Sequence, residues 1–256
     1  LMRWGIWLLV VQIFLAAITA GMFYMWELFD PEDVLATASE MQAGFTEIYT
    51  IFGEGSFQDV AIQRWRDWGI YFFIGLFAQG PGVLAFFLFG LAAVKSGVIS
   101  DPSASLWVRA RKLALPIGLI LSLFGAYLAA TSDSLMTAQE MLGLAFITLG
   151  SPFATFGYLG WLAKWAAGPN TAFRTFVARG GTATLTAYLM QSIILSLIFS
   201  GYGLGLYGEI GAAGCIGIAL ATGVFTLVFA SLWRKMFERG PFEYVLRRFT
   251  YWGADR

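Results

Sequence analysis

Uncharged polar side chains gather in one apolar segment of the chain, between residues 182 and 200. These side chains are Thr184, Thr186, Tyr188, Gln191 and Ser192. At helical spacing Thr184, Tyr188 and Gln191 share one face, and the other two flank it. Hydroxyl and amide groups on such a stripe can hydrogen-bond a neutral polar ligand or a neighbouring helix. We therefore predict either a substrate-facing polar stripe or a set of interhelical hydrogen bonds.

Three arginines form a second candidate site. Arg179 precedes the polar stripe, and Arg247 and Arg248 follow the last apolar segment. Guanidinium forks match the geometry of phosphate groups, so these side chains are candidates for contact with an anion or a lipid headgroup. The alternative is a plain anchor, because the residues after Gly240-Pro241 form a short basic and aromatic helix suited to a membrane surface.

The chain lacks the residues that much enzyme chemistry needs. It contains no histidine and a single cysteine, Cys215. Histidine-ligated haem or zinc, imidazole-activated nucleophiles, intrachain disulfides and cysteine metal clusters are therefore excluded. We predict no cofactor and no metal site, and we assign no residue as catalytic.

Long apolar segments position these candidates. Each is near or above the roughly 20 residues that a helix needs to cross a bilayer. They cover residues 4–25, 68–96, 113–131, 141–166, 182–200 and 212–233. The composition agrees, with 58% hydrophobic and 12% charged residues. We predict an all-α, polytopic transmembrane helical bundle of about six spans, with an amphipathic extracytoplasmic helix and a basic interfacial C-terminal helix.

The charges between the segments alternate in sign. The first long connection and the short third and fifth ones are acidic, whereas the second, the fourth and the C-terminal tail to Arg256 are basic. Lysine and arginine mark cytoplasmic loops, which predicts a multi-pass membrane protein with both termini inside. The net charge of zero conceals this asymmetry. Membrane lipids are the expected partners, and nucleic acid is not.

The first connection and the second span carry local signals. Asp30-Pro31 predicts the start of an amphipathic helix, and Gly53-Glu54-Gly55 predicts its end. That helix either packs at the membrane surface or covers a substrate. Ser56 with Asp59 predicts the next helix start, and Gly80-Pro81-Gly82 predicts a kink.

A small-residue ridge marks the last span. Ala213, Gly217 and Ala221 recur at four-residue spacing, which allows close approach of another helix. Subunits of a membrane complex, or a homo-oligomer, are therefore possible partners.

Two motifs carry a family resemblance. The sequence Arg-Gly-Gly-Thr-Ala-Thr-Leu-Thr-Ala-Tyr-Leu-Met-Gln-Ser at residues 179–192 resembles the hallmark of the YeiB-like bacterial integral membrane proteins (domain of unknown function 418). Gly-Pro-Phe-Glu-Tyr at 240–244, followed by Leu-Arg-Arg-Phe-Thr-Tyr at 246–251, resembles the closing motif of the same family. The chain departs from the hallmark at Thr182 and Ala187, where the family usually has arginine and asparagine.

The resemblance also implies a domain organisation. Residues 1–256 are expected to form a single transmembrane domain, with a first span and amphipathic segment at 1–55 and a YeiB-like C-terminal membrane region at 56–256. Family members begin with helices that bear a Leu-Asp-x-x-Arg-Gly motif, and this motif does not occur here. We therefore expect an N-terminal membrane half to precede the chain.

Three functions follow as alternatives. The distant likeness of this family to membrane acyltransferases implies an enzyme acting on a lipidic or cell-envelope substrate. A transporter would move a small or lipidic solute along the polar stripe. A non-catalytic subunit or assembly factor would use its small-residue surface within a membrane complex.

Overall fold

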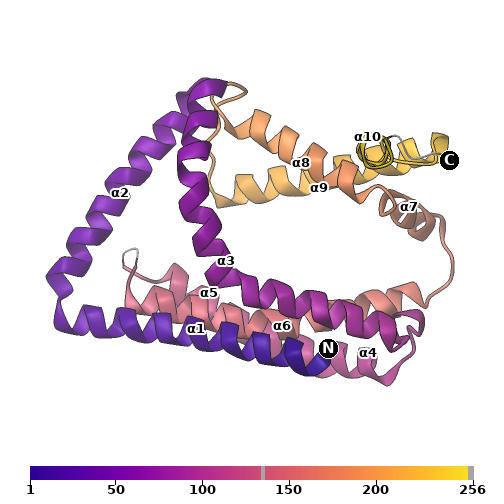
Figure 1. Cartoon of the computed structure of the whole chain (residues 1–256), viewed down its shortest axis with the longest axis horizontal. Helices are drawn as coiled ribbons and strands as arrows, with labels where there is room; N and C mark the ends of the chain where they lie inside the picture. Colours follow the sequence, from indigo (N-terminus) through magenta and orange to yellow (C-terminus); the bar gives the residue numbers. More distant parts are fainter. Residues whose placement is uncertain (134–135, 253–256) are drawn as a thin grey trace. The chain divides into compact units, whose positions relative to one another are not determined.

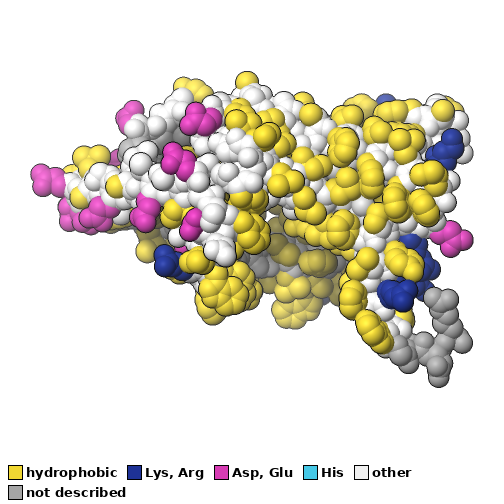
Figure 2. Space-filling view, turned by 90° about the horizontal axis from the view of Figure 1, so that it is seen from above, with side chains coloured by type: hydrophobic (Ala, Val, Ile, Leu, Met, Phe, Trp, Pro, Cys, Tyr) yellow, Lys and Arg dark blue, Asp and Glu magenta, His cyan; other side chains and the backbone are white. Residues whose placement is uncertain are grey.

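The structure is a computed structural model that describes residues 1–133 and 136–252, so Arg256 lies outside the described residues. Across these ranges every regular element is helical. Five helical segments are long and apolar enough to cross a membrane, and a sixth is obtained if a bent helix pair counts as one span. These segments confirm the all-α, multi-pass class. Hydrophobic side chains accordingly cover much of the face seen in Figure 2.

The chain divides into two compact units. Unit 1 comprises residues 1–43 and 67–168, and unit 2 comprises residues 44–66 and 169–256. The first candidate spans are α1 (Met2–Phe29) and α3 (Phe57–Lys95). The third is one segment made of α4 (Ser105–Arg109), the π-helical η2 (Ala110–Ala114) and α5 (Leu115–Ala130). The others are α6 (Ala138–Ala166), the bent pair α7 (Ala172–Gly180) and α8 (Thr184–Phe199), and α9 (Ala212–Met236). The shorter elements are η1 (Val98–Ser100) and α10 (Pro241–Thr250), and α2 (Pro31–Glu54) joins α1 to α3.

Glycines bring α5 and α6 of unit 1 into backbone contact, and Figure 1 shows the two helices side by side. A Cβ atom on Gly118 would lie 2.2 Å from the Ala154 nitrogen, and one on Gly125 would lie 2.4 Å from the Gly143 oxygen. Apolar burial drives little association inside a bilayer, so close van der Waals packing has to hold such a pair together. The glycine contacts are therefore the packing core of unit 1.

A glutamine side chain fixes α1 against the proline of α3. The Gln12 amide nitrogen donates to the Ala78 oxygen, and the Gly82 nitrogen donates to the Gln12 carbonyl oxygen at 3.0 Å. Ala78 and Gly82 are the two groups that a regular helix would join to each other. The side chain thus enters the hydrogen-bond ladder beside Pro81, which is a recognised cause of helix bending. Backbone loosened at the Gly-Pro-Gly sequence is satisfied within the chain.

The first connection folds as its sequence signals predict. Helix α2 begins at Pro31, and the Asp33 nitrogen donates to the Asp30 carboxylate at 3.2 Å. At the start of α3, the Ser56 and Asp59 side chains bond each other and each other's backbone nitrogens. The amphipathic helix and the following helix start are both confirmed.

The loop between α8 and α9 closes on the end of α2. The Gly201 nitrogen donates to the Phe52 oxygen at 2.8 Å, and a Cβ atom on Gly201 would lie 2.7 Å from the Gly53 oxygen. The Tyr207 ring stacks on the Phe52 ring with centroids 5.4 Å apart. Glycines at both segments allow this approach. The hydrogen bond and the ring stacking then hold the end of α2 beside the connection between α8 and α9.

The predicted small-residue ridge of the last span is exposed in the described part of the chain. Ala213, Gly217 and Ala221 are exposed, and a Cβ atom on Gly217 would find nothing within 4 Å. The buried residues of α9 are Thr222, Thr226, Ala230 and Ser231, which lie further along the helix. Within the chain, the close helix contact instead uses the glycines of α5 and α6.

Replacing Gly118 with alanine should destabilise the protein by about 1–3 kcal/mol, because the added methyl meets the backbone of α6 and the two helices must separate. The matched control is Gly75→Ala in α3, where the new Cβ meets nothing within 4 Å. That change should be neutral or stabilising by up to about 1 kcal/mol. Thermal unfolding of the detergent-solubilised variants measures both. Equal Tm values for the two variants would contradict the packing described.

Candidate functional site

The predicted span at 182–200 is the second half of a broken pair. Helix α7 ends at Gly180, α8 begins at Thr184, and their axes differ by 75°. Gly180 is buried, and a Cβ atom there would lie 2.6 Å from Leu227 of α9. The absence of a side chain at Gly180 thus permits a tight contact between α7 and α9. The break leaves the first backbone N–H groups of α8 without intrahelical acceptors.

Glu243 of α10 supplies the missing acceptor. The Thr186 nitrogen donates to one Glu243 carboxylate oxygen at 3.1 Å, and the Thr186 hydroxyl donates to the other at 2.5 Å. The same hydroxyl oxygen accepts from the Phe242 nitrogen at 3.1 Å. Each helix therefore caps the N-terminus of the other, in the manner of a capping box shared between two helices. The carboxylate also complements the positive end of the α8 dipole.

Gly240 and Pro241 make this arrangement possible. A Cβ atom on Gly240 would lie 2.2 Å from a Glu243 carboxylate oxygen and 2.6 Å from the Thr186 hydroxyl. Pro241 occupies the first turn of α10, where a missing N–H costs nothing. The sequence Gly-Pro-Phe-Glu thus has a local physical reason, which is to deliver a carboxylate to the start of α8.

The electrostatics of Glu243 follow from its surroundings. Burial alone would raise the pKa of the carboxyl group, but the hydrogen bonds from the Thr186 hydroxyl and backbone lower the pKa below its ordinary value. The Thr186 side chain is fully buried. The group is thus held as a carboxylate, already engaged by the protein.

Further polar contacts hold the broken pair on α9. Arg234 Nε donates to the Thr182 hydroxyl at 2.7 Å. The Ser231 hydroxyl, fully buried, donates to the Phe176 oxygen at 2.9 Å. These bonds are interhelical contacts of the kind that polar side chains form within membranes.

The structure divides the predicted polar stripe. Thr186 turns to α10, and the Gln191 amide donates to the Thr226 hydroxyl of α9 at 3.2 Å. Thr184, Tyr188 and Ser192 are exposed, with Tyr188 67% exposed, and the Ser192 hydroxyl donates to the Tyr188 oxygen within α8. Ligand binding by the exposed group stays a prediction.

The predicted arginines occupy different places in unit 2. Arg247 lines a cavity between α10 and the end of α9, together with Arg239, which the sequence analysis did not select. Arg248 bonds the Tyr244 hydroxyl at 3.4 Å, and Arg179 lies on α7 and does not line this cavity. The turn of the chain between α9 and α10 brings Arg239 and Arg247 to one cavity.

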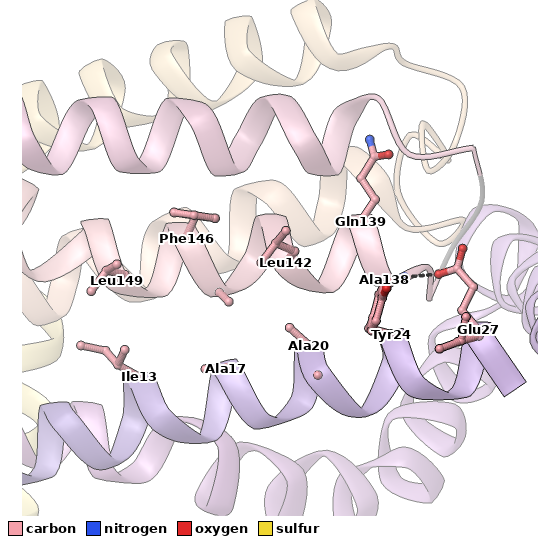
Figure 3. A pocket seen from close by; sticks show the side chains of 13 residues that line it. Ile13, Ala17, Ala20, Tyr24, Glu27, Ala138, Gln139, Leu142, Phe146 and Leu149 are labelled. Carbon is pink, nitrogen blue, oxygen red and sulfur yellow. Dashed lines mark hydrogen bonds between the residues drawn. The ribbon is translucent and has the colours of Figure 1, made fainter.

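Unit 1 holds an apolar groove between α1 and α6 that the sequence analysis did not identify (Figure 3). Its volume is about 870 Å³. Small residues of α1 form one wall, namely Ala17, Ala20 and Gly21, and larger residues of α6 form the other, namely Leu142, Phe146 and Leu149. The small residues lie on one helix and the large residues on another that is far away in the sequence. No local sequence pattern therefore indicates the groove.

Polar groups close one end of the groove. The Ala138 nitrogen, at the start of α6, donates to a Glu27 carboxylate oxygen at 2.7 Å (Figure 3). Gln139 bonds the Leu128 oxygen and the Thr131 hydroxyl, each at 3.0 Å. Tyr24 lines the same end. The groove is therefore apolar along its walls and polar at this end.

Fold and site together define a polytopic α-helical membrane protein with an apolar groove between two candidate spans and a bent helix pair. Residues 93–253 match the family described as "Protein of unknown function (DUF418)". The chain belongs to this family, as the two motifs predicted.

Two curated relatives are similar to this chain. The uncharacterized protein YxaH of Bacillus subtilis (strain 168) is 31% identical over 212 residues, which cover 78% of this chain and 50% of YxaH. The uncharacterized protein YeiB of Escherichia coli (strain K12) is 26% identical over 103 residues, which cover 40% of this chain and 26% of YeiB. The chain thus spans half or less of the length of these relatives. No solved structure matches it.

Replacing Glu243 with glutamine should destabilise unit 2 by about 1–3 kcal/mol at neutral pH, because an amide cannot accept both Thr186 bonds as a carboxylate does. A carboxylate with a lowered pKa stabilises the fold above its unfolded pKa, and this stabilisation is lost as the pH falls through the folded pKa. The stability difference between wild type and Glu243→Gln should therefore shrink below about pH 4. Thermal unfolding across pH measures it.

The control is Glu238→Gln, which removes the same charge from an exposed position close by. It should change the stability by less than about 0.5 kcal/mol. A Glu243→Gln variant that unfolds like this control at every pH would show that the shared capping contributes nothing.

Proposed function

We propose that this protein handles a long-chain lipidic substrate in the bacterial inner membrane, as part of an acyltransferase-like protein. The observation that carries the proposal is the groove between α1 and α6. In this proposal the groove holds an acyl or polyprenyl chain, and the polar end at Glu27 lies next to the substrate's polar group.

The lining of the groove supports a hydrocarbon occupant. Its volume of about 870 Å³ lies within the range of small-molecule sites, and its walls are almost wholly aliphatic or aromatic. Ala17 and Gly21 leave space along α1 where larger side chains would close it. A flexible apolar chain fills such a space better than a compact polar solute does.

The polar end supports a substrate with a headgroup. Glu27 accepts from the backbone of α6, so its carboxylate is fixed in position at the mouth. A fixed carboxylate beside Tyr24 can orient a hydroxyl or an ammonium group of a bound molecule. In this proposal Glu27 positions the substrate, and the reacting groups are supplied by the part of the relatives that this chain does not span.

Transport is the second candidate, and the break between α7 and α8 favours it. Broken helices expose backbone groups to solutes in many transporters. Here the N-terminus of α8 is already bonded to Glu243, so a solute that uses this end has to displace that carboxylate. This competition makes lipid handling the stronger proposal.

A phenylalanine at Gly21 should reduce the lipid that copurifies with the protein by at least about threefold, because the ring enters the groove. A Cβ atom at Gly21 meets nothing within 4 Å, so the change should leave the fold intact. Mass spectrometry of lipid extracted from the purified protein, referred to protein amount, measures the effect.

The matched control is Gly75→Phe in α3, a helical glycine that also has nothing within 4 Å and does not line the groove. It should retain the lipid level of wild type. Equal retention by Gly21→Phe and wild type would exclude the groove as the binding site. If the lipid is lost, membranes that also contain the part with the reacting groups are supplied with a labelled acyl donor. Acyl transfer then leaves a labelled product, whereas transport leaves none.

A further inference from the structure

We infer that unit 2 contains a second binding site, for the phosphate of an anionic lipid headgroup, in the cavity between the end of α9 and α10. The volume of this cavity is about 850 Å³. The site is independent of the groove in unit 1, because all of its residues belong to unit 2.

Two guanidinium groups line the cavity. Arg239 precedes the glycine that starts α10, and Arg247 lies two turns along that helix. Both side chains are exposed, and neither forms an ion pair with a carboxylate in residues 1–133 and 136–252. The Arg247 guanidinium lies 5.1 Å from the centre of the Tyr251 ring, which leaves its hydrogen-bond donors available. Two such groups facing one cavity suit a phosphate, which accepts bidentate bonds.

The local charge remains positive with all neighbours included. Two carboxylates repel an anion, Glu238 in the lining of the cavity and Glu243 in the first turn of α10. Arg234, Lys235 and Arg248 belong to the same two segments and add positive charge around it. An anionic ligand therefore experiences a net attraction, although a weaker one than the two lining arginines alone would give.

Aromatic side chains also line the cavity. The Trp233 and Phe237 rings stack with centroids 4.4 Å apart, and the Trp233 indole donates to the Arg239 oxygen at 2.9 Å. That bond fixes the backbone of an arginine that lines the site. Tyr244 adds a phenol ring. A cavity lined by both guanidinium groups and stacked rings suits an amphipathic ligand.

The surroundings favour a lipid over free phosphate. Helix α10 places exposed Leu246 and Phe249 among its arginines, as helices that lie in a membrane interface do. The cavity is also much larger than one phosphate ion requires, which leaves room for the glycerol and the first acyl carbons. The shared cap at Thr186 and Glu243 fixes the start of α10, so the cavity is preformed.

The test is native mass spectrometry of the delipidated, detergent-solubilised protein titrated with phosphatidylglycerol. The double variant Arg239→Gln/Arg247→Gln should bind at least about tenfold more weakly than wild type, because charge-assisted bonds to phosphate are lost. The matched control Lys235→Gln/Arg248→Gln removes the same charge from the same two segments, at exposed residues that do not line the cavity. It should bind within about twofold of wild type. Circular dichroism checks that both variants are folded.

Two ligand arms separate the sources of phosphate. Phosphatidylcholine should bind at least about tenfold more weakly than phosphatidylglycerol, because its choline carries a compensating positive charge. Inorganic phosphate should compete poorly, because it makes no apolar contact. Equal losses in the two double variants would show a diffuse attraction to a basic surface, and unchanged binding in the lining variant would exclude the cavity. Competition by inorganic phosphate as strong as by the lipid would overturn the assignment to a headgroup.

Discussion

Interrupted helices and helix starts in a membrane protein leave backbone groups that the protein itself must satisfy, and this constraint shapes both units. A free N–H or C=O group in hydrocarbon costs several kcal/mol, by the general cost of an unbonded polar group (about 2–7 kcal/mol). In this chain a side chain from another element meets each of three such needs. Gln12 bonds the backbone beside Pro81, Glu27 caps α6, and Glu243 caps α8. Each bond joins segments far apart in the sequence and so fixes the tertiary structure.

These three bonds also account for where the candidate sites lie. The hydrogen bond of Glu27 joins α1 to the start of α6, and the small residues of α1 leave the groove open next to this bond. Glu243 ties α10 to α8, and the residues on either side of that tie line the arginine cavity. Polar capping and ligand space are thus coupled in each unit. A side chain that completes the backbone bonding also holds a cavity wall in place.

The sequence predicts much of the fold and less of the site, for reasons visible in particular residues. Spans such as 4–25 and 212–233 are continuous apolar runs, so length and composition identify them. The helix start at Ser56 and the end at Gly53-Glu54-Gly55 are local signals and are confirmed. The 75° break is signalled only by Gly180-Gly181, which a hydropathy pattern hides. The structure bonds Glu243 to Thr186, which lies 57 residues away in the sequence. No periodicity reports a contact of that range.

The most direct measurement of the central claim is amide hydrogen exchange resolved to single residues. The amide of Thr186 lies in the first turn of α8, where an uncapped N–H exchanges quickly. With Glu243 as its acceptor, this amide should exchange as slowly as those in the middle of α8, and Glu243→Ala should raise its rate by at least about tenfold, as loss of one buried hydrogen bond requires. Fast exchange at Thr186 in the wild-type protein, or no change in the variant, would contradict the account.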